Sequence, residues 1–122
     1  MNKKKAYDDE NIFAKILRNE SNAEVVHETK NVLCFNDMYP QAPVHILIIP
    51  KGKFKDINDF SKNANAEQKI EIFDSFKVLI DKFKLNANGC RILTNFGSDG
   101  RQEVPHLHFH LVGGKDVGRM FN

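Results

Sequence analysis

The chain of 122 residues contains no tryptophan, only two cysteines and no large excess of charge of either sign. Cys34 and Cys90 lie far apart in separate apolar stretches, and no Cys-x-x-Cys occurs. We therefore expect two reduced core thiols, with no disulfide and no cysteine-based zinc site. A formal net charge of +2 gives no reason to expect binding to nucleic acid or to a membrane surface.

Long apolar runs are also missing, since none approaches the length needed to cross a bilayer. The basic start, Lys3 to Lys5, is followed by polar and acidic residues instead of an apolar segment. We therefore expect neither a signal peptide nor a membrane span, and a cytoplasmic location. The length and composition predict a single globular domain over residues 1–122, with a flexible arm at 1–9 and a tail at 115–122.

Hydrophobic periodicity predicts an α+β fold that contains an antiparallel β-sheet, one short helix and one long helix. A helix capped by Asp9 or Asn11 should run to Leu17, and apolar residues at helical spacing predict the long helix over 66–84. Residues 57–60 suggest a single turn. The expected strands are Ala23–His27, Val32–Asn36, His45–Pro50, Cys90–Asn95 and a strand that carries residues 106–110.

The stretch from Asn95 to Gly114 carries the most specific pattern of the sequence. His106, His108 and His110 alternate with apolar residues, so a strand would place the three imidazoles on one face, roughly 6–7 Å apart. The preceding Gly-Ser-Asp-Gly favours a tight turn. One phosphate or one metal ion could touch two of these side chains at once.

These motifs resemble the histidine triad (HIT) superfamily, and the resemblance extends from about Ile12 to Gly114. The Gly113-Gly114 pair after the triad and the Asn95-x-Gly-Ser-Asp-Gly segment before it are similar to the Hint branch of purine nucleoside phosphoramidases. The upstream segment from Asp37 to Lys51, which contains His45, is a second match. The resemblance implies a HIT-like fold, a homodimer with a sheet that extends across both copies, and a purine nucleotide as substrate or product.

The resemblance also implies roles for individual residues. Asp37 would accept hydrogen bonds from the ribose hydroxyls, and the phosphate would lie near Asn95 and Gln102. Glu103 stands where many Hint-type proteins have serine, so we expect only its backbone N–H to contact the phosphate. The other predicted substrate-binding residues are Ile12, Phe13, Ile16, Met38 and Leu47. No cofactor or metal is implied.

Catalysis would depend on the four histidines. Neutral imidazole is a good nucleophile near pH 7, and His108 is the histidine flanked by one on each side. The family mechanism implies that His108 attacks the α-phosphorus of a nucleoside phosphoramidate, with its Nδ1 proton held by a backbone carbonyl near the first histidine. His110 would donate to the phosphate or the leaving group, while His106 and His45 support the network.

Three alternatives remain open from the sequence alone. The triad also occurs in dinucleoside polyphosphate hydrolases of the same superfamily, although these typically continue differently after it. Histidines two apart on a strand are good zinc ligands, and His45 could be a fourth. A binding module without catalysis would preserve the same pattern.

Overall fold

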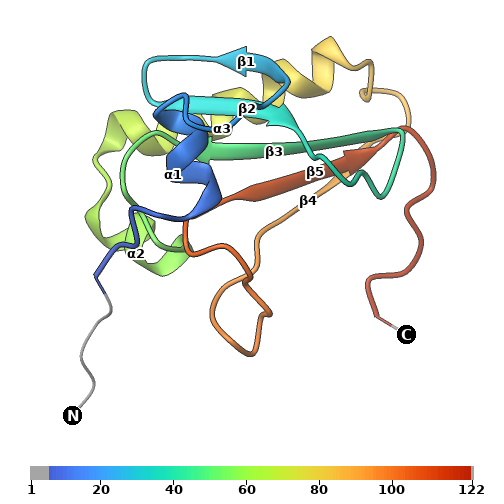
Figure 1. Ribbon diagram of the computed structural model, residues 1–122. Coiled ribbons are helices and arrows are strands. Elements are labelled where there is room, and N and C mark those ends of the chain that lie inside the picture. Colours follow the sequence, from blue (N-terminus) through green and yellow to red (C-terminus); the bar gives the residue numbers. More distant parts are fainter. Residues whose placement is uncertain (1–5, 122) are drawn as a thin grey trace.

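The computed structural model describes residues 6–121 and contains one five-stranded antiparallel sheet, with the strand order β1-β2-β3-β5-β4 (Figure 1). The strands are β1 (Val25–Glu28), β2 (Val32–Asn36), β3 (Val44–Pro50), β4 (Cys90–Leu93) and β5 (Phe109–Gly113). β5 lies between β3 and β4, so the crossover that links β3 to β4 leaves space for the last strand of the chain. The predicted α+β fold with an antiparallel sheet is confirmed.

Within the described part of the chain, three helices accompany the sheet: α1 (Ile12–Leu17), α2 (Ile57–Asn63) and α3 (Ala66–Lys82). Asn11 caps α1 as predicted, because its Oδ1 accepts from the backbone N–H of Ala14 at 2.9 Å. The prediction of a single turn at 57–60 was too short, since Asp56 caps a full helix there. α3 ends at Lys82, two residues earlier than expected, and Lys84 just after it takes the left-handed conformation, with φ of 58°.

The two faces of the sheet are covered by different helices. Alternate residues of β3, Ile46 and Ile48, pack on one face with the α3 side chains Ile72 and Leu79. The intervening residues Leu47 and Ile49 pack on the opposite face with Phe13 of α1. The period of two along β3 therefore decides which side chains meet α3 and which meet α1.

The histidine-bearing segment forms less strand than the alternation predicted. β5 begins only at Phe109, so His110 lies on the strand while His106 and His108 precede it. The ladder is replaced there by other bonds: Leu107 N–H donates to the Phe54 carbonyl at 2.8 Å, and Thr94 Oγ1 donates to the His108 carbonyl at 2.7 Å. The predicted apolar face is nevertheless correct, because Leu107 and Leu111 are both fully buried against α3.

The two ends of the chain differ in how they are held. The predicted frayed arm falls partly on residues 1–5, which lie outside the described residues, as does residue 122 of the tail. Within the arm, Tyr7 departs from the prediction because its ring packs edge-on against His106, with centroids 5.6 Å apart. Cys34 and Cys90 are free thiols. No helix within residues 6–121 is long and apolar enough to span a bilayer.

Candidate active site

A cavity of about 1000 Å³ lies over the α1 face of the sheet. Its walls are α1, the loop between β2 and β3, and the loop between β4 and β5. Most of the residues that the sequence predicted for the site line this one cavity: Ile12, Phe13, Ile16, Asp37, Met38, His45, Leu47, Asn95, Glu103, His108 and His110. Two predicted residues, His106 and Gln102, are not among the lining residues.

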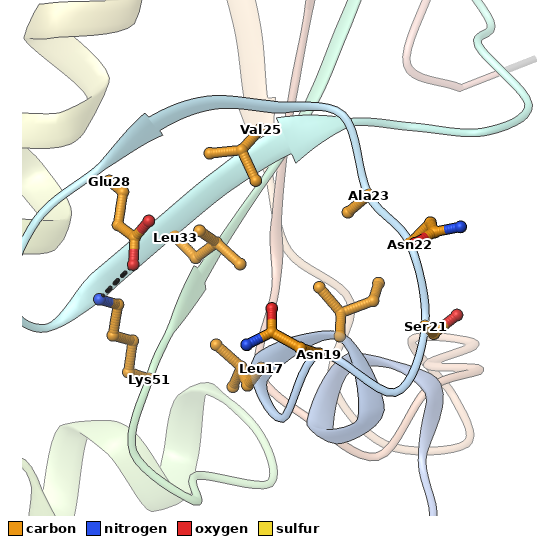
Figure 2. A pocket seen from close by; sticks show the side chains of 10 residues that line it. Leu17, Asn19, Ser21, Asn22, Ala23, Val25, Glu28, Leu33 and Lys51 are labelled. Atoms are coloured by element: carbon orange, nitrogen blue, oxygen red, sulfur yellow. Dashed lines mark hydrogen bonds and ion pairs between the residues drawn. The ribbon is translucent and has the colours of Figure 1, made fainter.

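A second, smaller cavity of about 400 Å³ adjoins it beyond the C-terminal end of α1 (Figure 2). Leu17 and Asn19 lie on one side of it, and Val25 and Leu33 of the sheet lie on the other. The two cavities share four lining residues: Ile16, Ser21, Asn22 and Ala23. No histidine lines the smaller cavity, so the chemistry of the predicted site belongs to the larger one.

His108 lies at the floor of the large cavity with 7 % of its surface exposed. Its Nδ1 lies 2.7 Å from the backbone carbonyl of His106. A carbonyl oxygen can only accept, so Nδ1 carries the proton and Nε2 keeps a free lone pair. The ring is also held edge-on by Phe13, with centroids 4.9 Å apart. This geometry presents an oriented imidazole to the cavity, with the lone pair of Nε2 free.

The protonation of His110 is set by a chain of two hydrogen bonds. The backbone N–H of Gln41 donates to His45 Nδ1 at 3.0 Å, so neutral His45 must carry its proton on Nε2. His45 Nε2 lies 2.9 Å from His110 Nδ1, which must therefore accept. His110 then carries its own proton on Nε2. The result is a pair of histidines with opposite tautomers, His108 with a free lone pair and His110 with a free donor.

His106, which we expected to support the catalytic network, does not line the cavity. It is fully buried, and its Nε2 donates to the Pro50 carbonyl at 2.9 Å. Its Nδ1 therefore accepts from the Tyr7 hydroxyl at 2.5 Å. Both ring nitrogens are used in the structure, and the contribution of His106 to the site is the backbone carbonyl that orients His108.

Gln102 is likewise a structural residue of the loop between β4 and β5. Its Nε2 donates to the carbonyls of Lys55 at 2.7 Å and Val104 at 3.0 Å, and its Oε1 accepts from the Gly97 N–H at 3.3 Å. The expected contact between the Gln102 side chain and a phosphate would require these bonds to break. Asn95 does line the cavity, while its Nδ2 donates to the Gly100 carbonyl at 2.7 Å.

The end of the cavity beside α1 is apolar. Phe13, Phe35 and Leu47 are all nearly buried there, and Phe13 and Phe35 meet edge to face with centroids 5.7 Å apart. Phe35 was missed as a site residue, although it lies directly opposite Leu47 in the β2–β3 register. Its alternation with Cys34 could have placed it on the α1 face. Val104 and Arg101, which also line the cavity, were missed too, and no sequence pattern identifies them.

Burial keeps the histidines of the triad neutral. Desolvation lowers the pKa of His106 to about 4. Desolvation, together with the neighbouring His108 and His45, also lowers the pKa of His110 to about 4. The pKa of His108 is lowered by desolvation, partly offset by its bond to the His106 carbonyl and by Asp37 and Glu103. All three are therefore unprotonated on one nitrogen at neutral pH, which is the form in which an imidazole can act as a nucleophile.

The zinc alternative would use a different set of ligands from the one the sequence suggested. His106 and His108 do not belong to the cluster that could hold a metal, which consists of Asp37, His45 and His110, with ligand atoms within 4.8 Å of one another. Tetrahedral zinc separates two imidazole nitrogens by about 3.3 Å. The His45 and His110 nitrogens are 2.9 Å apart and hydrogen-bonded, so a metal would have to displace the shared proton and open the pair.

Comparison with known proteins identifies the family. A family model for the HIT domain matches residues 18–117. The chain is 44% identical to an uncharacterized HIT-like protein of Azospirillum brasilense, over 95% of each protein. It is 37% identical to the purine nucleoside phosphoramidase of Escherichia coli, over 92% of this chain and 93% of that protein.

Solved structures agree with the sequence relatives. A HIT family hydrolase from Clostridium thermocellum superposes with a TM-score of 0.84 at 33% identity, covering 93% of this chain and 97% of that one. A HIT family hydrolase from Legionella pneumophila gives a TM-score of 0.81 at 42% identity, covering 87% of this chain and 94% of that one. The alternating histidines, the sheet and the cavity thus define a histidine triad domain. The chain belongs to the HIT family.

Proposed function

We propose that this protein is a hydrolase that cleaves the P–N bond of purine nucleoside 5′-phosphoramidates through a nucleotidyl-histidine intermediate. The observation that carries the proposal is the 2.7 Å bond between His108 Nδ1 and the His106 carbonyl, which leaves His108 Nε2 free inside the cavity. The similarity to the Escherichia coli purine nucleoside phosphoramidase supports the choice of substrate.

The shape of the cavity suggests how the nucleotide lies. Its apolar end, formed by Phe13, Phe35 and Leu47, suits a purine base. The Asp37 carboxylate is partly exposed and can accept from ribose hydroxyls, although its Oδ1 already accepts from the Tyr39 N–H at 2.8 Å. The phosphate would then lie over His108 and His110, beside Asn95. Met38, Ile12 and Ile16 would complete the nucleoside wall.

The reaction has two steps. His108 Nε2 attacks phosphorus and forms a P–N bond, while the bond from phosphorus to the leaving nitrogen breaks and its electron pair stays on that nitrogen. The amine takes a proton from solvent, because neutral His110 has no proton to give without becoming an anion. Water then attacks phosphorus, loses a proton to solvent and displaces His108. In both steps His110 Nε2–H donates a hydrogen bond to a phosphate oxygen.

The test is to trap the intermediate during turnover of adenosine 5′-phosphoramidate. Acid-quenched protein should gain the mass of one nucleoside monophosphate, and the adduct should map to His108. His108→Ala should lower turnover by at least about 10³-fold while nucleotide binding largely survives. An adduct on His106 or His110, or near-normal turnover by the alanine variant, would show that the nucleophile is wrongly assigned.

Assays on the same purified protein distinguish the competing functions. Parallel assays of adenosine and guanosine phosphoramidates and of a diadenosine polyphosphate distinguish a phosphoramidase from a dinucleoside polyphosphate hydrolase. Loss of activity with a chelator would favour the metal site at Asp37, His45 and His110. Binding of nucleotide without any turnover would favour a binding module.

We also propose that the protein is a cytoplasmic homodimer whose sheet continues through β4. That strand is at the edge of the sheet, so its outer hydrogen-bonding groups are available to a second copy. Ile70 and Phe73 of α3 are 58% and 73% exposed, which leaves apolar surface for a partner to cover. Light scattering at micromolar concentration should give twice the mass of the chain, and a monomer would remove this proposal.

A further inference from the structure

Arg101 occupies an unusual backbone position at the edge of the active-site cavity. Its φ of 59° lies in the left-handed region, where a side chain carries a steric cost that glycine would avoid. Among the described residues that line the large cavity, Arg101 is the one non-glycine residue with a positive φ. A strained residue that faces a functional cavity is a reason to look for a role of its side chain.

The backbone of the loop around Arg101 is held in place by several hydrogen bonds. The Arg101 N–H donates to the Ser98 carbonyl at 3.1 Å, and the Gln102 N–H donates to the Gly97 carbonyl at 3.0 Å. The Asn95 side chain holds the Gly100 carbonyl from below at 2.7 Å. Arg101 thus lies on a hydrogen-bonded part of the loop between β4 and β5, which also contributes Asn95 and Glu103 to the lining of the cavity.

Arg101 differs in charge from the other ionisable residues that line the cavity. Three carboxylates face the space: Glu24, Asp37 and Glu103. Arg101 is the sole lysine or arginine among the lining residues of the described chain. Burial lowers the pKa of His108 and His110, so these two side chains supply no permanent positive charge at neutral pH. Among the described residues, Arg101 forms no salt bridge that would neutralise it.

The direction of the reaction shows which part of the substrate meets Arg101. His108 lies at the floor with 7 % of its surface exposed, so it attacks phosphorus from below. An in-line displacement then directs the leaving group away from the floor and toward the opening. Arg101 both lines the cavity and is exposed to solvent, as a residue at the rim of the opening must be. Its guanidinium can form paired hydrogen bonds with a carboxylate there.

We propose that Arg101 is a specificity-determining residue that favours nucleoside phosphoramidates whose leaving amine carries a carboxylate. The inference rests on the proposed function and extends it to the class of leaving group. Glu103, exposed on the same loop, opposes such a substrate and should weaken the preference. The substrate class is thus an adenosine phosphoramidate of an amino-acid-like amine.

The test compares two adenosine 5′-phosphoramidates that differ in one group, with β-alanine or β-alanine amide as the leaving amine. For the wild type, kcat/KM should be higher for the carboxylate, and Arg101→Gln should lower the carboxylate-to-amide ratio by on the order of 10-fold. Arg101→Lys should keep part of the preference, because it keeps the charge but loses the planar fork. Glu103→Gln should raise the ratio.

Two controls separate specificity from folding. Arg101→Gly should raise the melting temperature by relieving the left-handed strain, yet lower the ratio as the glutamine variant does. Lys62→Gln removes an exposed charge from α2, outside the cavity, and should leave the ratio unchanged. Equal effects of Arg101→Gln on both substrates, or a wild-type ratio near one, would overturn the inference.

A binding measurement keeps the inference testable if turnover is absent. In a His108→Ala background, calorimetry should show that Arg101→Gln weakens binding of the carboxylate substrate but leaves AMP and the amide substrate unaffected. Failure of the wild type to hydrolyse either compound would defeat the proposed function alone. Unchanged binding of the carboxylate compound would defeat the inference about Arg101.

Discussion

The tautomer of His110 depends on His45, and replacing His45 with phenylalanine tests this dependence directly. His45 is 6% exposed and connects the Gln41 N–H, at 3.0 Å, to His110 Nδ1, at 2.9 Å. Phenylalanine keeps a buried ring of similar size but has neither the acceptor nor the donor. In His45→Phe, His110 Nδ1 loses the hydrogen bond that forces its proton onto Nε2.

The expected loss follows from that single hydrogen bond. A typical intramolecular hydrogen bond contributes about 0.5–1.5 kcal/mol, and each 1.4 kcal/mol corresponds to about tenfold in a rate or population. We therefore expect kcat to fall by about 2- to 10-fold, far less than for loss of the nucleophile. The stability should fall by about 0.5–1.5 kcal/mol, because the Gln41 N–H loses its acceptor.

The decisive measurement is NMR of protein labelled with 15N in its histidine rings. In the wild type, His108 should carry its proton on Nδ1 and His110 on Nε2. In His45→Phe, His110 should become a mixture of tautomers, while His108 stays unchanged because the His106 carbonyl holds it at 2.7 Å. Ser75→Ala removes a buried hydrogen bond on α3 and controls for general destabilisation. A wild-type His110 protonated on Nδ1 would refute the reasoning.

The other predictions concern the ribose, the buried His106 and the pH profile. Asp37→Ala should weaken ribonucleotide binding by about 1–3 kcal/mol, and a 2′-deoxy analogue should lose less; equal losses would mean that Asp37 only holds its loop. Tyr7→Phe should lower the free energy of unfolding by about 1 kcal/mol in chemical denaturation, because His106 Nδ1 loses its donor; an unchanged value would show that the hydroxyl bond contributes nothing. Activity should fall on the acid side with a midpoint below pH 6.5, since the pKa of His108 is lowered and attack needs its neutral form; a midpoint above 6.5 in kcat/KM would contradict this. His106 has a pKa of about 4 in the folded protein against 6.5 ordinarily, so the unfolded chain binds more protons between these values. His106 alone should lower the free energy of unfolding by about 3 kcal/mol from pH 6.5 to 4, and His110, with a similarly lowered pKa, should add to the decline. Unfolding curves that change by less than about 1 kcal/mol over this range would contradict the burial of the two rings.

The period of two along the strands explains how much of the site was readable from sequence. His45 and Leu47 are two residues apart on a predicted strand and so share a face, and both line the cavity. For the triad, the same rule predicted a strand that was too long. Pairing between β3 and β5 ends at Ile48 and Phe109, so His106 and His108 lie before the strand. Beyond that register, His106 replaces a ladder bond by donating from its side chain to Pro50. The alternation of histidine and apolar residues therefore extends into a segment, His106 to His108, that is not part of a strand.

The parts of the site that sequence could not predict are mostly backbone groups. The His106 carbonyl and the Gln41 N–H decide which nitrogen of His108 and of His110 is free, yet neither depends on a side chain. Any residue except proline at position 41 would supply the same N–H. The chemical identity of position 41 therefore carries no signal of its role, whereas a change of loop length between Asp37 and His45 would move the donor and release His110. In this site the histidines are specified by sequence, and their opposite protonation is specified by the path of the chain around them.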